Sequence, residues 1–116
     1  MKSSNTDAAQ AFFNLLPIYY FIEATQQAPK RIGYSFEDYH CVYGKDPEAD
    51  PGDEFDGVQL TFVDEVWNMS ETEFFQGLIQ AAEFRIKSHG SDAEQIRKII
   101  SEIESEIRKI SHPIEG

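Results

Sequence analysis

Apolar and polar positions divide the chain into a helical beginning, a strand-rich middle and a helical end. Apolar residues between Phe12 and Ile22 cover more than one face of a helix, which predicts a deeply packed segment. We expect Asn5 or Thr6 to cap this helix. Pro17 should kink or break it, because proline removes a backbone donor. The aromatic side chains of this segment are predicted to lie in the core rather than around a ligand.

The middle of the chain shows the short patterns of strands. Residues 39–43 (YHCVY) are rich in residues that favour strands, and residues 57–63 (GVQLTFV) alternate as a half-buried strand does. Asp64 is expected to turn the chain into a second strand (EVWNM), which gives a β-hairpin that ends at Ser70. Residues 44–57 contain two prolines, three glycines and clustered acids, which is typical of a loop.

Two further helices are predicted after the hairpin. SETE at residues 70–73 and SDAE at residues 91–94 are capping boxes, and the first helix should stop at Gly90. Five isoleucines spaced by four, three, four and three residues predict a seam against a neighbouring helix: Ile96, Ile100, Ile103, Ile107 and Ile110. We therefore expect residues 1–116 to form a single, helix-rich α+β domain. It should contain an N-terminal helix, a small antiparallel sheet that includes the hairpin, and a C-terminal helical hairpin.

Composition narrows the class of partner. A chain of 116 residues that is 41% hydrophobic can bury one core, and its formal net charge is −11. This charge disfavours direct binding of nucleic acid or of an anionic membrane, and it favours a basic protein partner. Excess acid also serves solubility alone. No secretory signal is seen and the longest apolar run is too short to span a membrane, so we expect the protein to lie in the cytoplasm. We also expect it to be a monomer.

Candidate catalytic and metal sites are weak. A calcium loop beginning at Asp46 would need glycine at its sixth position and glutamate at its twelfth, where this chain has Pro51 and Gly57. His40 and Cys41 are adjacent and would point to opposite faces of a strand, so they do not form a zinc site. Cys41 as a nucleophile with a distant histidine stays an open alternative. We expect a protein without enzymatic activity, metal or cofactor.

Acidic and aromatic residues gather between Tyr34 and Trp67. Ten carboxylates stand there against one basic residue, Lys45, while most Lys and Arg lie in the first 33 residues and in the last helix. This stretch is either a solvated loop beside core aromatics or a binding face, since Tyr and Trp anchor interfaces and carboxylates pair with Arg and Lys. The predicted partner-binding residues are Glu37, Asp38, Tyr39, Asp46, Glu48, Asp50, Asp53, Glu54, Asp56 and Trp67. Within this set, the loop from Asp46 to Glu54 is the better candidate for contact, with residues 37–39 expected nearby and Trp67 at the border.

The C-terminal two thirds of the chain resembles a known family. Its outline is an acidic turn, the strand motif Phe55-Asp56-Gly57-Val58, a second strand with Glu65-Val66, and the helix start from Ser70 to Phe74. This outline is similar to immunity proteins of bacterial contact-dependent growth inhibition (CDI) systems, in the family of ribonuclease toxin immunity proteins.

The resemblance implies a function that agrees with the charge. Such a protein binds the C-terminal nuclease domain of its cognate toxin in the cytoplasm and blocks access of the substrate. A nuclease is basic around its active site, so an acidic inhibitor would associate quickly and compete with RNA. The alternative is an acidic adaptor or nucleic-acid mimic that binds another basic protein.

Overall fold

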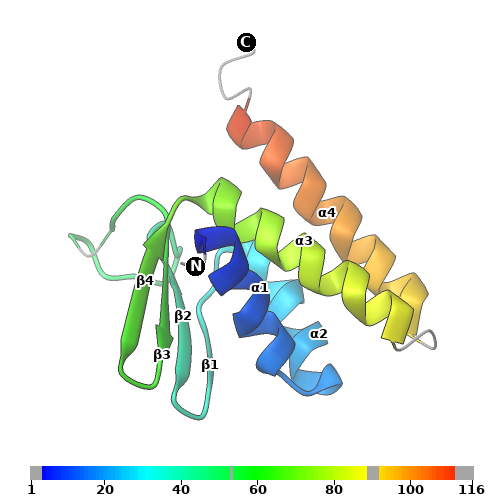
Figure 1. Ribbon diagram of the computed structural model, residues 1–116. Helices are drawn as coiled ribbons and strands as arrows, with labels where there is room; N and C mark the ends of the chain where they lie inside the picture. Colours follow the sequence, from blue (N-terminus) through cyan, green and yellow to red (C-terminus); the bar gives the residue numbers. More distant parts are fainter. Residues whose placement is uncertain (1–3, 53, 89–91, 112–116) are drawn as a thin grey trace.

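The computed structural model describes residues 4–52, 54–88 and 92–111, and it confirms the predicted α+β class. Helices and a sheet form two layers, with the helices on one face of the sheet (Figure 1). The elements in chain order are α1 (Asn5–Leu15), α2 (Ile18–Gln27), the short 3₁₀ helix η1 (Ala28–Lys30), β1 (Tyr34–Phe36), β2 (Tyr39–Tyr43), β3 (Val58–Phe62), β4 (Glu65–Met69), α3 (Glu71–Ser88) and α4 (Ala93–Ser111).

The sheet is an antiparallel meander in the order β1-β2-β3-β4. Its register places Cys41 beside Leu60 and Leu60 beside Trp67. Because side chains alternate along a strand, Cys41 and Leu60 share the face that meets the helices, where both are buried. The predicted hairpin is confirmed: β3 and β4 are joined by a turn at residues 63–64, with Phe62 paired to Glu65.

The cap of the first helix differs from the prediction. Ser4, rather than Asn5 or Thr6, is the cap: its hydroxyl accepts from the Asp7 backbone N–H at 3.0 Å, and the Asp7 carboxylate accepts from the Ser4 N–H. The break at Pro17 is confirmed, since α1 ends at Leu15 and α2 begins after this proline.

The aromatic core of this segment is confirmed only in part. Phe12, Phe13 and Phe21 are buried, with ring centroids of Phe13 and Phe21 6.1 Å apart. Tyr19 is 71% exposed and Leu15 is 49% exposed, so the expectation of deep packing on every side was wrong. The helix break accounts for the difference, because α1 and α2 each present one separate face to the core.

Helices α1 and α3 pack so closely that the backbone of α3 at Gly77 touches α1. A Cβ at Gly77 would collide with the Ala9 side chain and the Thr6 carbonyl oxygen, so only glycine allows this approach. Glycine costs roughly 1 kcal/mol in a helix interior, and the close packing of the two helices offsets that cost.

The C-terminal helical hairpin is confirmed. Ser70 caps α3, as its hydroxyl accepts from the Glu73 N–H and the Glu73 carboxylate accepts from the Ser70 N–H. The predicted box at Ser91 and the stop at Gly90 lie outside the described residues. In α4, Ile96 and Ile103 are buried as expected, and Ile99 joins them while Ile100 is only partly buried. Ile100, Ile107 and Ile110 are partly buried and pack against the same core, so all five predicted isoleucines face the rest of the protein.

Two arginines tie the helical layer together. Arg31 donates to Glu71 at 2.8 Å and 3.0 Å and to Glu106 at 2.8 Å, so it links η1 to α3 and α4. The hydrogen bond to Glu71 raises the pKa of Arg31 above its ordinary value, and Glu106 adds to the rise against the opposing effect of burial. Burial raises the pKa of Glu106, but the hydrogen bonds from Arg31 and Lys109 together lower it by more. The net shift of the Glu106 pKa is therefore downward.

Arg85 closes the end of α1. Its guanidinium donates to the carbonyl oxygens of Phe13, at 2.9 Å, and of Leu16, and it lies 4.6 Å from the centre of the Phe21 ring. These carbonyls belong to the last turn of α1, where a helix leaves acceptors without intrahelical donors. Arg85 thus supplies additional donors at the helix break, where Pro17 has no N–H to offer the Phe13 carbonyl. Across the described residues, no helix is both long and apolar enough to cross a membrane.

Candidate partner-binding surface

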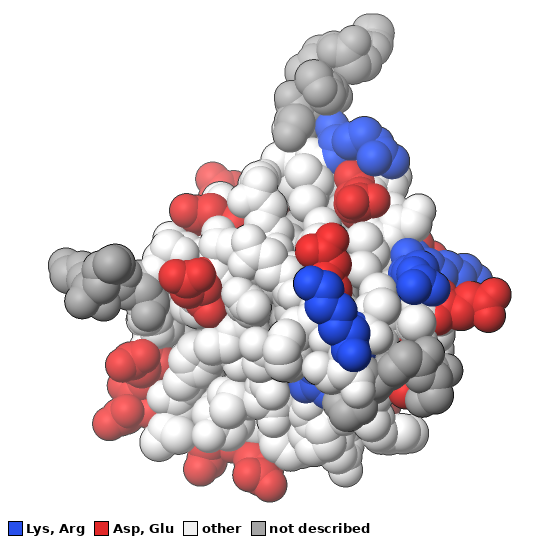
Figure 2. All heavy atoms as spheres, turned by 45° about the vertical axis from the view of Figure 1, so that its right-hand side comes forward, with Lys and Arg blue, Asp and Glu red and all other residues white. Residues whose placement is uncertain are grey.

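Charge is unevenly distributed between the two layers. On the face drawn in Figure 2, Lys and Arg side chains gather in the middle and to the right, whereas the coloured side chains at the left and bottom are Asp and Glu. The left of this view is the side of the sheet. This distribution agrees with the segregation of charge along the sequence.

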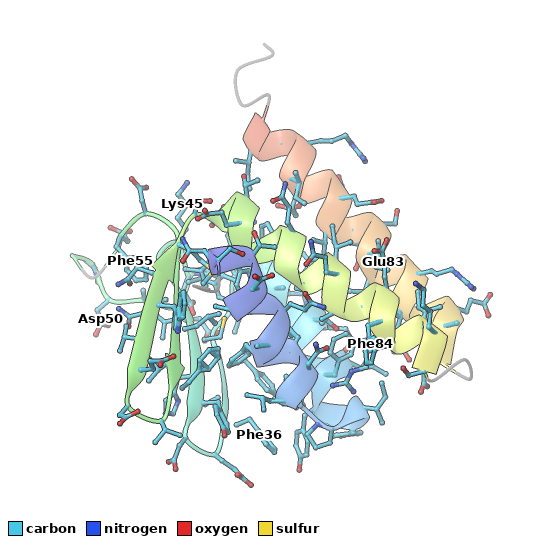
Figure 3. The ribbon with its side chains drawn as sticks, in the orientation of Figure 1. Phe36, Lys45, Asp50, Phe55, Glu83 and Phe84 are labelled. Carbon is cyan, nitrogen blue, oxygen red and sulfur yellow. The ribbon has the colours of Figure 1, made fainter. Side chains whose placement is uncertain are left out.

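The acidic loop, which we define as residues 44–57, connects β2 to β3 and is closed at its base by backbone hydrogen bonds. Gly44 donates to the Gly57 carbonyl at 2.9 Å, and Phe55 donates to the Gly44 carbonyl at 3.3 Å. Gly57 has φ of +94°, and a Cβ there would meet the Met69 carbonyl oxygen, so this position requires glycine. Asp50 and Phe55 lie on the side of the sheet away from the helices (Figure 3).

Asp46 anchors the loop. Its carboxylate accepts from the Gly33 N–H at 2.9 Å and from the Glu48 N–H at 2.7 Å. One of the predicted contact residues therefore holds the backbone in place, which is the usual role of an Asp in a turn.

The other carboxylates of the acidic loop face outward. Glu48, Asp50, Glu54 and Asp56 are exposed, and none lies within 4.0 Å of a Lys, Arg or His nitrogen in the part of the chain that the structure describes. Asp53, also predicted to bind the partner, lies outside the described residues. The loop thus presents charge that the described part of the fold does not neutralise.

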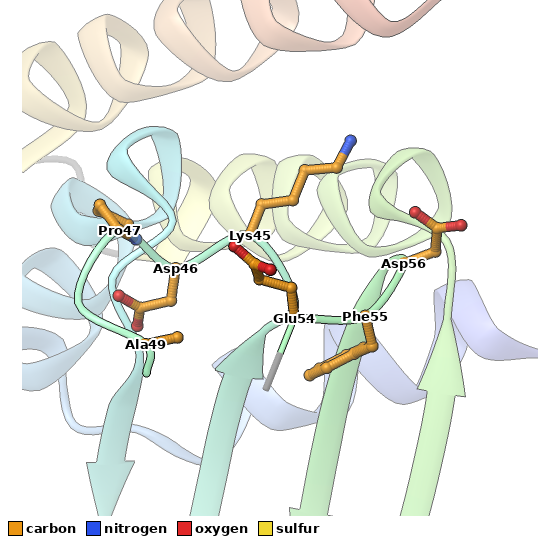
Figure 4. A pocket seen from close by; sticks show the side chains of 7 residues that line it. All are labelled: Lys45, Asp46, Pro47, Ala49, Glu54, Phe55 and Asp56. Atoms are coloured by element: carbon orange, nitrogen blue, oxygen red, sulfur yellow. The ribbon is translucent and has the colours of Figure 1, made fainter. Parts of the chain in front are cut away.

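A hollow of about 540 Å³ opens in the acidic loop (Figure 4). Its lining combines charged and apolar side chains: Lys45, Asp46, Pro47, Ala49, Glu54, Phe55 and Asp56. The Lys45 side chain extends toward the helices, whereas the Phe55 ring points the opposite way, along the sheet (Figure 4). Phe55 is 37% exposed, so the hollow offers an apolar surface beside its carboxylates.

Glu37 and Asp38 lie at the other end of the sheet. They form the turn between β1 and β2, and the Asp38 carbonyl accepts from the Val63 N–H in the neighbouring turn at 3.1 Å. The expectation that residues 37–39 lie near the acidic loop was wrong, because the length of β2, roughly 15 Å, separates the two. The predicted residues thus form two acidic groups, one at each end.

Tyr39 and Trp67 belong to the helix-facing side of the sheet. Tyr39 packs on Phe62, with ring centroids 6.3 Å apart, and the Trp67 indole donates to the Glu65 carboxylate at 2.9 Å. Both are partly buried and pack against the core. The aromatic rings of Tyr39 and Trp67 therefore stabilise the fold.

The opposite face of the sheet, which we call the open face, carries residues that are absent from the predicted contact set. It alternates with the buried positions and consists of Ser35, His40, Val42, Gln59, Thr61, Val66 and Asn68. Val42 and Val66 are 42% and 55% exposed. Strand alternation is the signal that could have identified them, because side chains of successive residues point to opposite faces of a sheet.

The chemistry of Cys41 is that of a core residue. Burial raises the pKa of its thiol to about 12, so the thiol stays protonated at neutral pH and is a poor nucleophile. His40 and Cys41 point to opposite faces of β2, as predicted, and His40 lies on the open face with its Nδ1 2.8 Å from the Ser35 hydroxyl. No group of three His, Cys, Asp or Glu side chains is placed to hold a metal ion within residues 4–52, 54–88 and 92–111.

Comparison with known proteins identifies the family. A search of curated proteins finds no match to this chain. A family model described as CDI immunity protein matches residues 5–100, which include α1, the entire sheet, α3 and the first part of α4. The acidic loop and the open face lie within the matched residues. The chain belongs to the CDI immunity protein family.

Proposed function

We propose that this immunity protein neutralises a nuclease toxin by binding over its active site, with the acidic loop as a principal contact. Membership of the family gives an immunity function against a CDI toxin and implies that the cognate toxin is the partner. The proposal adds the class of toxin, the contact surface and the mechanism of inhibition.

One observation carries the proposal: the loop presents four exposed carboxylates that have no cationic partner among the described residues. A surface that grips the phosphates of RNA or DNA is basic, so it complements these carboxylates. The loop is also held in shape by its closed base and by Asp46, which reduces the entropy lost when a partner binds. A carboxylate-rich loop can therefore occupy a site built for phosphates.

The charge also favours rapid association. Complementary charge steers two proteins together and raises the association rate constant most strongly at low salt. An immunity protein must capture its toxin before the toxin reaches a substrate, so fast association serves this function directly.

A matched pair of variants tests the contact surface. The loop variant carries Glu48→Gln, Asp50→Asn and Glu54→Gln, and the control carries three Glu→Gln changes at exposed positions of α4: Glu94, Glu102 and Glu104. Both variants change the net charge equally. Stopped-flow association with the cognate toxin domain should be about tenfold slower for the loop variant at roughly 50 mM salt, and the difference should shrink toward about 500 mM. Equal association rates for the two variants would refute the loop as the contact.

The mechanism and the toxin class need a separate measurement. Purified toxin should cleave RNA or DNA, and one equivalent of immunity protein should abolish both cleavage and binding of a non-cleavable oligonucleotide. If the toxin has no nuclease activity, the nuclease class is wrong. If the toxin–immunity complex still binds the oligonucleotide, occlusion of the active site is wrong.

A further inference from the structure

We infer that the toxin docks across the open face of the sheet, with the acidic loop at one edge of the interface and the two hairpin turns at the other. This inference rests on the proposed function, which names the partner but places its contact only at the loop.

The open face has the composition of an interface centre. Val42 and Val66 are exposed there, while the neighbouring polar groups pair with each other across the strands. The Gln59 amide donates to the Asn68 side-chain oxygen at 3.1 Å, and His40 lies 2.8 Å from the Ser35 hydroxyl. These two pairs satisfy part of the polar surface of this face, which lowers the cost of covering it with a partner. None of its seven residues carries an acidic or a Lys or Arg side chain.

Carboxylates border this face at both ends. At one end lie Glu54 and Asp56 of the acidic loop, and at the other end lie Glu37, Asp38 and Asp64 of the turns. The turns are joined by the hydrogen bond from Val63 to Asp38, so they form one continuous edge. An apolar and uncharged centre with a charged rim is the usual anatomy of a protein interface. The occupant that fits is a toxin surface with an apolar centre flanked by Lys or Arg.

Area supports docking across the whole face rather than at the loop alone. Four strands of up to five residues offer about 300 Å², from strand spacing and rise per residue. A specific complex buries about 800 Å² on each partner. The open face is too small alone, so an interface of this size has to extend onto the acidic loop or the turns at its ends.

The helical side offers a competing apolar residue. Phe84 on α3 is 54% exposed (Figure 3), and Glu83 and Lys87 of the same helix are exposed as well. Acidic and basic side chains are interspersed on this side, so it attracts a basic toxin surface less than the acidic ends of the sheet do. Phe84 therefore serves as the control position.

The test compares Val66→Arg on the open face with Phe84→Arg on α3. Both add one arginine at a position that is more than half exposed, so both should fold, which circular dichroism and the urea midpoint can check. In a titration of the cognate toxin domain, Val66→Arg should raise the Kd at least about 30-fold, whereas Phe84→Arg should change it less than about threefold. Val42→Arg provides a second variant on the open face, and it should weaken binding in the same direction.

The outcomes separate this inference from the proposed function. If the wild-type chain does not bind the toxin, the proposed function fails. If the loop variant slows association while Val66→Arg and Val42→Arg bind like the wild type, only the docking face is wrong. A larger loss for Phe84→Arg than for Val66→Arg would move the interface to the helices. A wild-type dimer that Val66→Arg dissociates, seen by sedimentation, would assign the face to a second copy and overturn the inference.

Discussion

The helical layer and the sheet side of this protein use their charged residues differently. In the helical layer, Arg31 pairs with Glu71 and Glu106, and Arg85 donates to the carbonyls that end α1. On the sheet side, the described carboxylates of the acidic loop and the turns lie in solvent, apart from Asp46, which is engaged by the backbone around it. Charge in the first region stabilises the fold, and charge in the second is available to a partner.

This difference shows that net charge alone is a poor guide to a binding surface. The −11 total includes carboxylates, such as Glu71 and Glu106, that the fold already uses. A candidate contact needs carboxylates that are exposed, have no internal partner and gather in one place, as they do in the acidic loop. Substitutions in the two regions should therefore separate stability from binding.

The largest effect on stability is expected at Arg85. Replacing it by leucine removes its hydrogen bonds to the Phe13 and Leu16 carbonyls in a buried setting, which should lower the free energy of unfolding by about 3 kcal/mol. Urea denaturation measures this loss, and the exposed Lys87→Leu is the control, with a change below about 0.5 kcal/mol. Equal losses would show that Arg85 does not support the helix break.

A smaller effect, dependent on pH, is expected at Glu106. Glu106→Gln removes the ionic hydrogen bonds to Arg31 and Lys109 and should cost about 1.5 kcal/mol at pH 7. Because the pKa of Glu106 is lowered on folding, its contribution is present above its ordinary value of 4.5 and is lost as pH falls through the folded value.

Denaturation at several pH values checks the sign of this effect. The wild type should lose stability below about pH 4.5 more steeply than Glu106→Gln. Glu73 keeps part of the slope in both proteins, since its hydrogen bonds with Ser70 and then Asn5 also lower its pKa. Parallel pH curves would contradict a role for Glu106 in the network. Glu104→Gln, at an exposed position of α4, is the control.

The smallest effect compares two acids within the acidic loop. Asp46→Ala removes two hydrogen bonds to the backbone and should cost about 1 kcal/mol of stability, whereas Asp50→Ala should leave stability unchanged. Asp50→Ala should instead slow association with the toxin by about twofold at low salt. If Asp50→Ala destabilises the fold as much as Asp46→Ala, the division between anchoring and contacting carboxylates is wrong.

Local signals in the sequence determined most of the secondary structure. Strand alternation in residues 57–63, the capping box at Ser70 and the proline at position 17 each act within a few residues, so they can be read without the fold. They predicted the hairpin, the start of α3 and the break after α1. The excess of acid between Tyr34 and Trp67 likewise pointed to this region as the candidate for partner binding.

The tertiary structure decided what those elements do for one another. The sequence around Gly77 does not indicate that this residue packs against α1. The sequence around Arg85 does not indicate that its guanidinium donates to the Phe13 carbonyl, 72 residues earlier in the chain. Likewise, only the pairing of the strands separated Glu37 and Asp38 from the acidic loop and brought Val42 of β2 and Val66 of β4 onto one open face. Contacts between residues distant in sequence depend on how the two layers pack, so a local sequence pattern cannot predict them.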